Sequence, residues 1–376
     1  MKPIGIMTFH ASYNCGSILQ CMALQKVLKE EFNMESEVIN FSNKGQRDVY
    51  SVFYKKKNLK NIVKNILCIP GKSMIEKHYE IYKNYIKNNI KMSKDRYLTD
   101  EQLNGIEDNY SMLISGSDQI WNVNCDDSDK AYFLSFANHT KKISYAASLG
   151  ATDIRETPEK EIYKDLISQY NYLSVRENNA KKWIEDLTGK DVEVVLDPTL
   201  LINEGEWKDI EQPLSEKLPN KFIFYYAFGY QKENNEAINN IAKEHNMKVV
   251  IIDSKQWYIK KLYKYSNFIL LEETGPNAYL NLIDKSEYVI TCSFHGAAFS
   301  SIFHKKFIYI NGKEHNPADD RAYTLLNELC LMKRFVTIND LSYQLLNEDI
   351  NYKEVDEKKK QLQEKSIGFL RKAINE

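Results

Sequence analysis

One local pattern recurs along this chain: a short apolar run, then polar or small residues, then a helix-like segment. Residues 3–9 form the first apolar run, residues 10–16 a polar loop and residues 17–31 an amphipathic helix. Strands that alternate with helices pair in parallel, because a parallel connection needs a long crossover. We therefore predict a doubly wound α/β protein. Its further strands are expected at 36–41, 112–115, 143–147, 172–175, 192–196, 222–228, 248–252, 268–271, 288–292 and 307–310.

A proline-containing segment divides the pattern into two halves. Residues 213–220, PLSEKLPN, carry two prolines in polar surroundings, and the strand–helix alternation restarts after them. The chain has 376 residues, which is more than one ordinary domain needs. We predict two Rossmann-like domains, over 1–212 and 213–350, that face each other across a cleft, and a C-terminal helix over 351–376.

Residues 42–100 interrupt the first half. They are rich in Lys, Tyr and Asn and show little periodicity before a helix near 74–90. We interpret them as a helical excursion or a flexible flap. Their lysines and tyrosines are expected to form a solvated face rather than a binding surface, although the region should shape the choice of substrate.

Charge, cysteine usage and hydropathy exclude several classes of protein. A net charge of −1 argues against a nucleic-acid binder. The six cysteines are scattered without a CxxC pair, which indicates reduced thiols and no zinc or other metal site. Met1 leads directly into a predicted strand, so we expect no signal peptide. No apolar run approaches the roughly 20 residues of a membrane helix. We expect a cytoplasmic protein without a transmembrane segment.

Polar and small residues follow several of the predicted strands. In a parallel sheet, ligands bind outside the carboxyl ends of the strands, where the next helices begin. Ser117 and Asp118 either cap the segment that holds Trp121 or accept hydrogen bonds from substrate hydroxyls. The substrate-binding candidates in the first half are Asn14, Gly16, Gly116, Ser117, Asp118 and Glu177.

The stretch from Tyr288 to Phe303 places a histidine at such a strand end. We predict a tight turn over Ser293-Phe294-His295-Gly296 and a helix over 297–303. Gly296 lets a ligand approach the backbone, and His295 lies at the carboxyl end of a strand, where active sites of α/β proteins are usually found. Alternatively, Ser293 caps the helix and His295 is a satisfied polar residue. The candidates here are Ser293, His295 and Gly296.

Arginine is rare in this chain, with seven among the 51 basic residues. A guanidinium binds an oxyanion through two parallel hydrogen bonds, which a lysine does poorly. Arg176, in the turn after a predicted strand, is therefore a candidate for binding an anionic substrate.

Five motifs occur in an order that resembles the polysaccharide pyruvyl transferase family. They are GSDQIW (116–121), SYAASLG (144–150), SVRE (174–177), LDPTLL (196–201) and SFHGAAFSSIF (293–303). The resemblance implies a GT-B-like fold with an acceptor-side N-terminal domain and a donor-side C-terminal domain. It also implies that Arg176 and His295 are active-site residues, and that Arg321 matches a basic residue at the start of a later helix.

The resemblance further implies a reaction and its partners. Family members move a pyruvyl group from phosphoenolpyruvate to a sugar, usually of a bacterial cell-envelope glycan or exopolysaccharide, and form a cyclic ketal. We thus expect phosphoenolpyruvate as co-substrate, a sugar or lipid-linked glycan as acceptor, and no cofactor or metal. A lipid-linked acceptor would allow the protein to associate peripherally with the inner membrane surface. Two alternatives stay open: a GT-B glycosyltransferase that uses a nucleotide sugar, and a non-catalytic glycan-binding protein.

Overall fold

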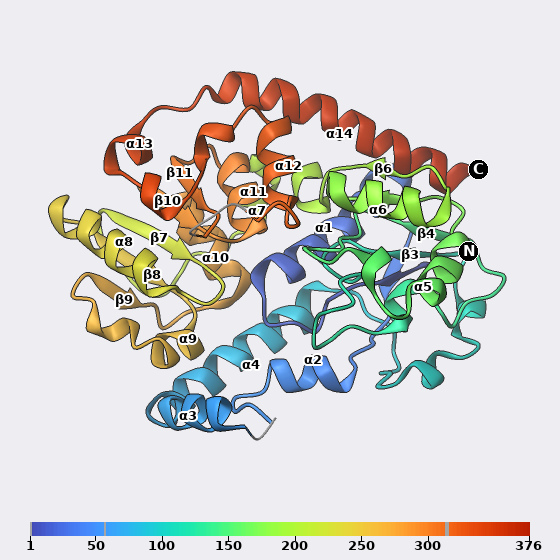
Figure 1. Cartoon of the computed structure of the whole chain (residues 1–376), viewed down its shortest axis with the longest axis horizontal. Helices are drawn as coiled ribbons and strands as arrows, with labels where there is room; N and C mark the ends of the chain where they lie inside the picture. Colours follow the sequence, from blue (N-terminus) through green and yellow to red (C-terminus); the bar gives the residue numbers. More distant parts are fainter. Residues whose placement is uncertain (1, 56–57, 313–315) are drawn as a thin grey trace.

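The computed structural model describes residues 2–55, 58–312 and 316–376. Residue 1, at the start of the predicted N-terminal domain, lies outside the described residues. So do 56–57, within the predicted helical excursion, and 313–315. The structure contains two α/β halves, each built on a sheet of parallel strands, and Figure 1 shows them side by side.

The first half is built on a parallel sheet with the strand order β2-β1-β3-β4. Single bridges, such as Ile143 to Tyr172 and Ala147 to Val175, extend it to a further pair of strands. The strands are β1 (Ile4–Met7), β2 (Ser36–Val38), β3 (Met112–Ser115), β4 (Lys142–Ser144), β5 (Ser174–Val175) and β6 (Glu193–Val194). Its main helices are α1 (Cys15–Phe32), α5 (Lys160–Ser168), α6 (Asn178–Thr188) and α7 (Glu204–Ile210).

The second half has the strand order β12-β11-β10-β7-β8-β9, all parallel. Strand β10 lies near the centre of this sheet, so the junction between β10 and the helix that carries His295 also lies near the centre. The strands are β7 (Phe222–Tyr226), β8 (Lys248–Ile251), β9 (Phe268–Leu270), β10 (Tyr288–Thr291), β11 (Phe307–Ile310) and β12 (Phe335–Val336). The helices are α8 (Lys232–Glu244), α9 (Ser254–Ile259), α10 (Gly275–Lys285), α11 (Phe294–Ile302), α12 (Arg321–Glu328) and α13 (Tyr343–Asn347).

One hydrophobic core continues from one half into the other. It contains residues of the first sheet, such as Ile6, of α1, such as Leu24, and of the second sheet, such as Phe224. Helix α1 packs against α10 and against the short helix η6 (Pro198–Leu201). Domains joined by a large apolar interface move little against each other, so this core holds the two sheet edges in a defined relation.

Helix α14 (Tyr352–Asn375) returns from the second half to the first and runs along one side of the molecule (Figure 1). The Leu196 amide donates to Ser366 Oγ at 2.9 Å, and Gln363 Nε2 donates to the Leu200 carbonyl at 2.6 Å. The helix therefore fastens the segment that follows β6. No helix in the described part of the chain is long and apolar enough to cross a membrane.

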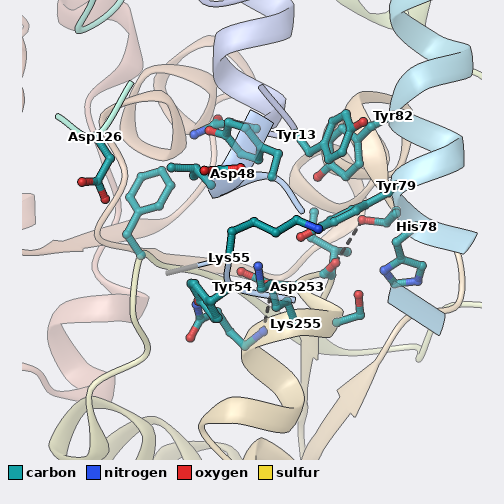
Figure 2. Close-up of a pocket in the computed structure, with 18 of the residues that line it drawn as sticks. Tyr13, Asp48, Tyr54, Lys55, His78, Tyr79, Tyr82, Asp126, Asp253 and Lys255 are labelled. Carbon is teal, nitrogen blue, oxygen red and sulfur yellow. Dashed lines mark hydrogen bonds between the residues drawn. The ribbon is translucent and has the colours of Figure 1, made fainter. Parts of the chain in front are cut away.

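Residues 42–100 are more helical than the sequence predicted. Besides α4 (Lys72–Asn89), the region contains α2 (Lys44–Val49), α3 (Leu59–Cys68) and the short η1 (Ile69–Gly71). Helix α4 packs on the second half, where His78 Nε2 lies 3.1 Å from the Glu272 carbonyl. The expectation of a purely solvated face is wrong for its tyrosines, because Figure 2 shows Tyr54, Tyr79 and Tyr82 around a cavity.

Candidate functional site

His295 comes from the strand–helix junction of the second half. The tight turn predicted over residues 293–296 is wrong, because α11 begins at Phe294 and His295 is its second residue. A Cβ on Gly296 would lie 2.1 Å from Thr291 Oγ1, so only glycine lets the helix start this close to the strand. Ser293 occupies the N-cap position but makes no side-chain cap, and its amide donates to Thr291 Oγ1 at 3.0 Å.

The His295 ring lies against the first half of the molecule. A Cβ on Gly16, the second residue of α1, would lie 2.1 Å from His295 Nδ1. Asn14 caps α1 by accepting hydrogen bonds from the Gly16 and Ser17 amides. Gly16 thus gives the imidazole its space, while Asn14 fixes the helix that carries Gly16. Both predicted residues belong to this junction between the two halves.

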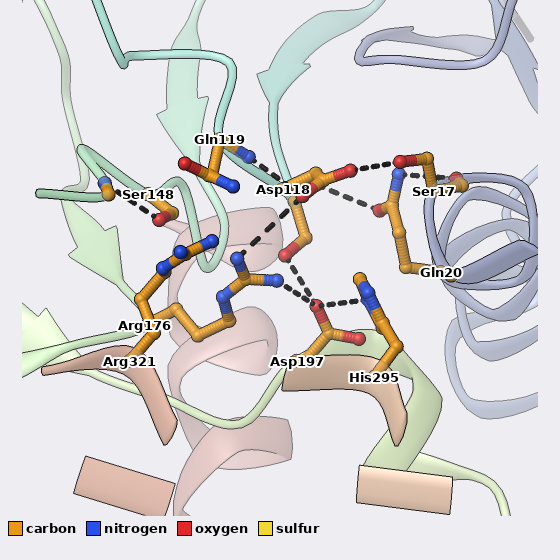
Figure 3. Close-up of polar contacts among 12 residues, drawn as sticks. Ser17, Gln20, Asp118, Gln119, Ser148, Arg176, Asp197, His295 and Arg321 are labelled. Atoms are coloured by element: carbon orange, nitrogen blue, oxygen red, sulfur yellow. Dashed lines mark hydrogen bonds and ion pairs between the residues drawn. The ribbon is translucent and has the colours of Figure 1, made fainter. Parts of the chain in front are cut away.

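Asp197 is the centre of the polar contacts around His295 (Figure 3). Its Oδ2 atom accepts hydrogen bonds from Arg176 and Ser117 Oγ, both at 2.9 Å, and lies 3.5 Å from His295 Nε2. Its Oδ1 atom accepts from the Thr199 amide and hydroxyl. Burial by itself would raise the pKa of Asp197, but His295 and Arg176 outweigh it and hold the pKa below its ordinary value.

Sequence reasoning did not select Asp197 as a site residue. It lies in the LDPTLL motif, between a strand end and a proline, where it also caps η6. An acidic residue at a strand end of a parallel sheet is the signal that could have identified it.

Arg176 is enclosed by acidic and aromatic side chains. Its guanidinium has nitrogens 3.7 Å from Asp118 Oδ1 and 4.0 Å from Glu177 Oε2, besides the bond to Asp197. The guanidinium carbon lies 4.1 Å from the centre of the Phe294 ring, in a cation–π contact. The side chain is 2% exposed, so these contacts hold it in one orientation.

The loop after β3 supplies the residues that support this arrangement. Asp118 accepts hydrogen bonds from Ser17 Oγ and from the Gln119 amide. Ser117 Oγ lies 2.8 Å from the Ala146 carbonyl as well as near Asp197. Gly116 has a φ of 129°, and a Cβ there would lie 2.0 Å from the Tyr145 carbonyl oxygen. Gly116 therefore serves the packing of the loop, whereas Ser117 and Asp118 belong to the polar contacts. Ser17 and Gln20 of α1 complete the set.

Glu177 and Arg321 also lie near Arg176. Glu177 Oε1 accepts a hydrogen bond from the Leu149 amide at 2.8 Å, and burial raises the pKa of this carboxyl to about 7. Arg321 opens α12 and forms two hydrogen bonds with Asp319, at 2.7 and 2.6 Å. Figure 3 shows Arg321 beside Arg176, so two of the seven arginines meet at one site.

Several buried polar atoms at this site have no hydrogen-bond partner among the described residues. They are Arg176 Nε, Glu177 Oε2, His295 Nε2 and Asp320 Oδ1. The contact of His295 Nε2 with Asp197 is within ion-pair range but too long for a good hydrogen bond. Buried polar groups are usually paired, so these four atoms are available to hydrogen-bond a ligand.

A cavity of about 600 Å³ lies next to these contacts and receives residues from both halves (Figure 2). Asn14 lines it and also caps α1, which places the cavity close to His295. Its wall is aromatic and charged. Its tyrosines, phenylalanine, histidine, lysines and aspartates are Tyr13, Tyr50, Tyr54, Tyr79, Tyr82, Tyr226, Phe228, His78, Lys44, Lys55, Lys255, Asp48, Asp126 and Asp253.

Burial also changes the charges in the cavity wall. It lowers the pKa of Lys255 to about 8 and raises the pKa of Asp253. Lys255 Nζ donates to the Ser51 carbonyl at 2.8 Å and lies 4.1 Å from the centre of the Tyr54 ring. Within the described ranges, no three His, Cys, Asp or Glu side chains are grouped so that they could hold a metal ion.

Solved structures resemble the whole chain. The S. aureus MnaA–UDP complex matches with a TM-score of 0.53 at 15% identity, over 96% of this chain and 88% of that chain. A putative UDP-N-acetylglucosamine 2-epimerase from Listeria monocytogenes matches with a TM-score of 0.51 at 14% identity, over 99% and 91% of the two chains. These are GT-B fold enzymes, so the predicted GT-B-like fold is confirmed.

Comparison by sequence identifies the family. Curated proteins provide no match. A family model described as polysaccharide pyruvyl transferase matches residues 14–314, which include Asn14, Asp118, Arg176, Asp197 and His295. The chain belongs to the polysaccharide pyruvyl transferase family.

Proposed function

We propose that this protein transfers a pyruvyl group from phosphoenolpyruvate to two hydroxyls of a cell-envelope sugar and forms a cyclic ketal. One observation carries the proposal: His295 and Arg176, from opposite halves of the molecule, both contact the buried Asp197 carboxylate. A proton-transferring group and an anion-binding group thus share one site in a member of this family.

The residues present fit an anionic donor. Phosphoenolpyruvate carries a carboxylate and a phosphate, and guanidinium groups bind both in a planar, bidentate manner. In the described part of the chain Arg176 Nε has no hydrogen-bond partner, and Arg321 adds a second guanidinium. A pKa of about 7 leaves Glu177 partly protonated near neutral pH, which reduces the negative charge that the donor meets.

His295 would move the protons of the reaction. The methylene carbon of phosphoenolpyruvate gains a proton and becomes a methyl group, while the neighbouring carbon becomes cationic and is attacked by a sugar hydroxyl. Phosphate then leaves and a second hydroxyl closes the ring. Overall, one hydroxyl proton ends on the methyl carbon and the other on phosphate. Asp197 holds the imidazole in position, as carboxylates do for many catalytic histidines.

The tyrosine-lined cavity would hold the acceptor sugar. Aromatic faces pack on the C–H faces of sugar rings, and carboxylates accept hydrogen bonds from hydroxyls. The cavity volume of about 600 Å³ is in the range of small-ligand sites. Asn14 connects the cavity to the residues that contact His295, so bound hydroxyls would approach the donor from this side.

The test is a reaction of the purified protein with phosphoenolpyruvate and a panel of cell-envelope sugar acceptors, both free and lipid-linked. We expect acceptor-dependent release of phosphate, together with a pyruvylated product detected by mass spectrometry. Absence of both with every acceptor would contradict the proposal. Turnover of a nucleotide sugar instead would support the glycosyltransferase alternative, and glycan binding without turnover would support the non-catalytic one.

A further inference from the structure

Helix α3 exposes a continuous apolar stripe. Its residues recur at the spacing that places side chains on one helical face. They account for five of the eleven exposed large hydrophobic side chains in the described part of the chain. Their exposed fractions are 83% for Leu59, 47% for Ile62, 55% for Val63, 58% for Ile66 and 61% for Ile69, which follows in η1.

The other side of α3 is fixed to the protein. Cys68 is fully buried, and α3 packs against α9. Gly71, at the end of η1, lies so close to Tyr258 of α9 that a Cβ there would be 1.8 Å from the ring. The helix is thus held by one face, and the apolar stripe is presented to solvent by the packing itself.

The sequence around the stripe carries charge of a single sign. Six lysines and no Asp or Glu occur between Val49 and Ile75, whereas the whole chain has a net charge of −1. Lys60 lies on α3 and is exposed. Lys72, at the start of α4, is exposed as well. An exposed apolar stripe flanked by lysines is typical of helices that lie in the interface of an anionic bilayer. Protein–protein interfaces, by contrast, are depleted in lysine.

The stripe also adjoins the cavity described above. A groove of about 570 Å³ runs between α3 and α9, with Leu59, Val63 and Ile259 in its wall. Tyr54 and Gln256 line both this groove and the 600 Å³ cavity. Figure 1 shows α3 at the periphery of the molecule, next to α9, where a flat surface can reach it.

We propose that α3 docks this protein on an anionic lipid surface, with the apolar stripe inserted among the acyl chains and the exposed Lys60 and Lys72 at the headgroups. Docking in this way turns the groove and the cavity toward the bilayer. If the proposed function holds, a lipid-linked sugar would reach the cavity without leaving the membrane. The docking surface itself does not depend on the identity of the donor.

Vesicle sedimentation tests the docking. We expect the protein to bind vesicles that contain phosphatidylglycerol and to bind phosphatidylcholine vesicles at least tenfold more weakly. Combining Ile62→Asp with Ile66→Asp should lower binding to the anionic vesicles at least tenfold. The far-ultraviolet circular dichroism and the melting temperature should not change, because both side chains are exposed. Ile162→Asp, at an exposed apolar position of α5, is the matched control and should bind as the wild type does.

Three results would overturn the proposal. The first is equal binding, or none, to the two kinds of vesicle. The second is loss of binding in Lys60→Glu with none in the double aspartate variant, which would leave only a surface charge effect. The third is a concentration-dependent dimer in sedimentation velocity that the double variant abolishes, because the stripe would then belong to a second copy of this chain. None of these measurements requires phosphoenolpyruvate, so they are independent of the phosphate-release assay.

Discussion

The charge contacts around Asp197 and the neighbouring tyrosine-lined cavity have opposite physical characters. Arg176, Asp197 and His295 are almost completely buried, and close packing at Gly16 and Gly296 holds the elements that carry them. The cavity has a volume of about 600 Å³, and its wall includes Phe228, which is 60% exposed.

This difference indicates a division of work between the two regions. A buried, fixed set of charges is suited to one small anionic donor and to proton transfer, because its charged groups are already oriented. An open aromatic wall is suited to a larger ligand, such as the sugar acceptor that we propose. Substitutions in the first region should therefore affect turnover and stability, and substitutions in the second should affect acceptor recognition.

The largest effect is expected for His295→Gln. Glutamine keeps hydrogen-bonding capacity but cannot transfer a proton, so kcat should fall by about 100-fold or more. Phosphate release under saturating donor and acceptor measures it. His139→Gln, at an exposed histidine beside Asp108, is the control and should retain full turnover. Near-normal turnover of the His295 variant would remove the histidine from proton transfer.

Two substitutions of Arg176 distinguish the effect of its charge from the effect of its planar geometry. Arg176→Ala leaves Asp197 buried without its ion-pair partner, which costs about 3–5 kcal/mol in the free energy of unfolding. Arg176→Lys keeps the charge but loses the planar fork, so the KM for phosphoenolpyruvate should rise about 10- to 100-fold.

Urea unfolding and donor titration measure these two effects. Arg155→Lys, at a partly exposed arginine paired with Asp153 and Asp186, serves as the control. An unchanged KM for the donor in Arg176→Lys would show that Arg176 forms a structural ion pair and does not bind the donor.

The raised pKa of Glu177 leads us to expect that the stability of the protein depends on pH. Its folded-state pKa of about 7 exceeds the ordinary value of 4.5, so the folded protein binds this proton more tightly than the unfolded chain does. The free energy of unfolding should therefore fall as the pH rises from about 4.5 to 7, by on the order of 2–3 kcal/mol, and the contribution is constant above that range.

Glu177→Gln should weaken this decline, as measured by urea unfolding at pH 5 and pH 7. Glu161→Gln, at an exposed glutamate of α5, should leave it unchanged. A decline of equal size in both variants would show that Glu177 is not its source.

The smallest effect is expected in the cavity wall. Phe228→Ala removes an exposed ring from the proposed acceptor cavity, so the KM for the acceptor should rise about three- to tenfold while kcat and the donor KM stay constant. Initial-rate kinetics with varied acceptor tests it, and Tyr263→Ala, an exposed ring outside the cavity wall, is the control. A change in kcat alone would place Phe228 with the catalytic contacts instead.

Much of the fold follows from local patterns in the sequence. The apolar runs predicted strands at 112–115 and 307–310, with the bounds that the structure has. The order of five motifs identified the family and, with it, the GT-B-like fold. These signals are readable because hydrophobic periodicity and turn residues act over a few neighbouring positions.

The candidate site depended on contacts between distant segments. The sequence selected His295 and Arg176 but passed over Asp197, and it assigned Gly16 to substrate binding without showing that the His295 ring lies against it. Likewise, the apolar spacing in α3 does not say which face is covered, and only packing on α9 leaves that stripe exposed. The sequence determines which side chains stand at strand ends. Which of them meet is decided by the shared core, because contacts across hundreds of residues depend on how two sheets pack and not on local spacing.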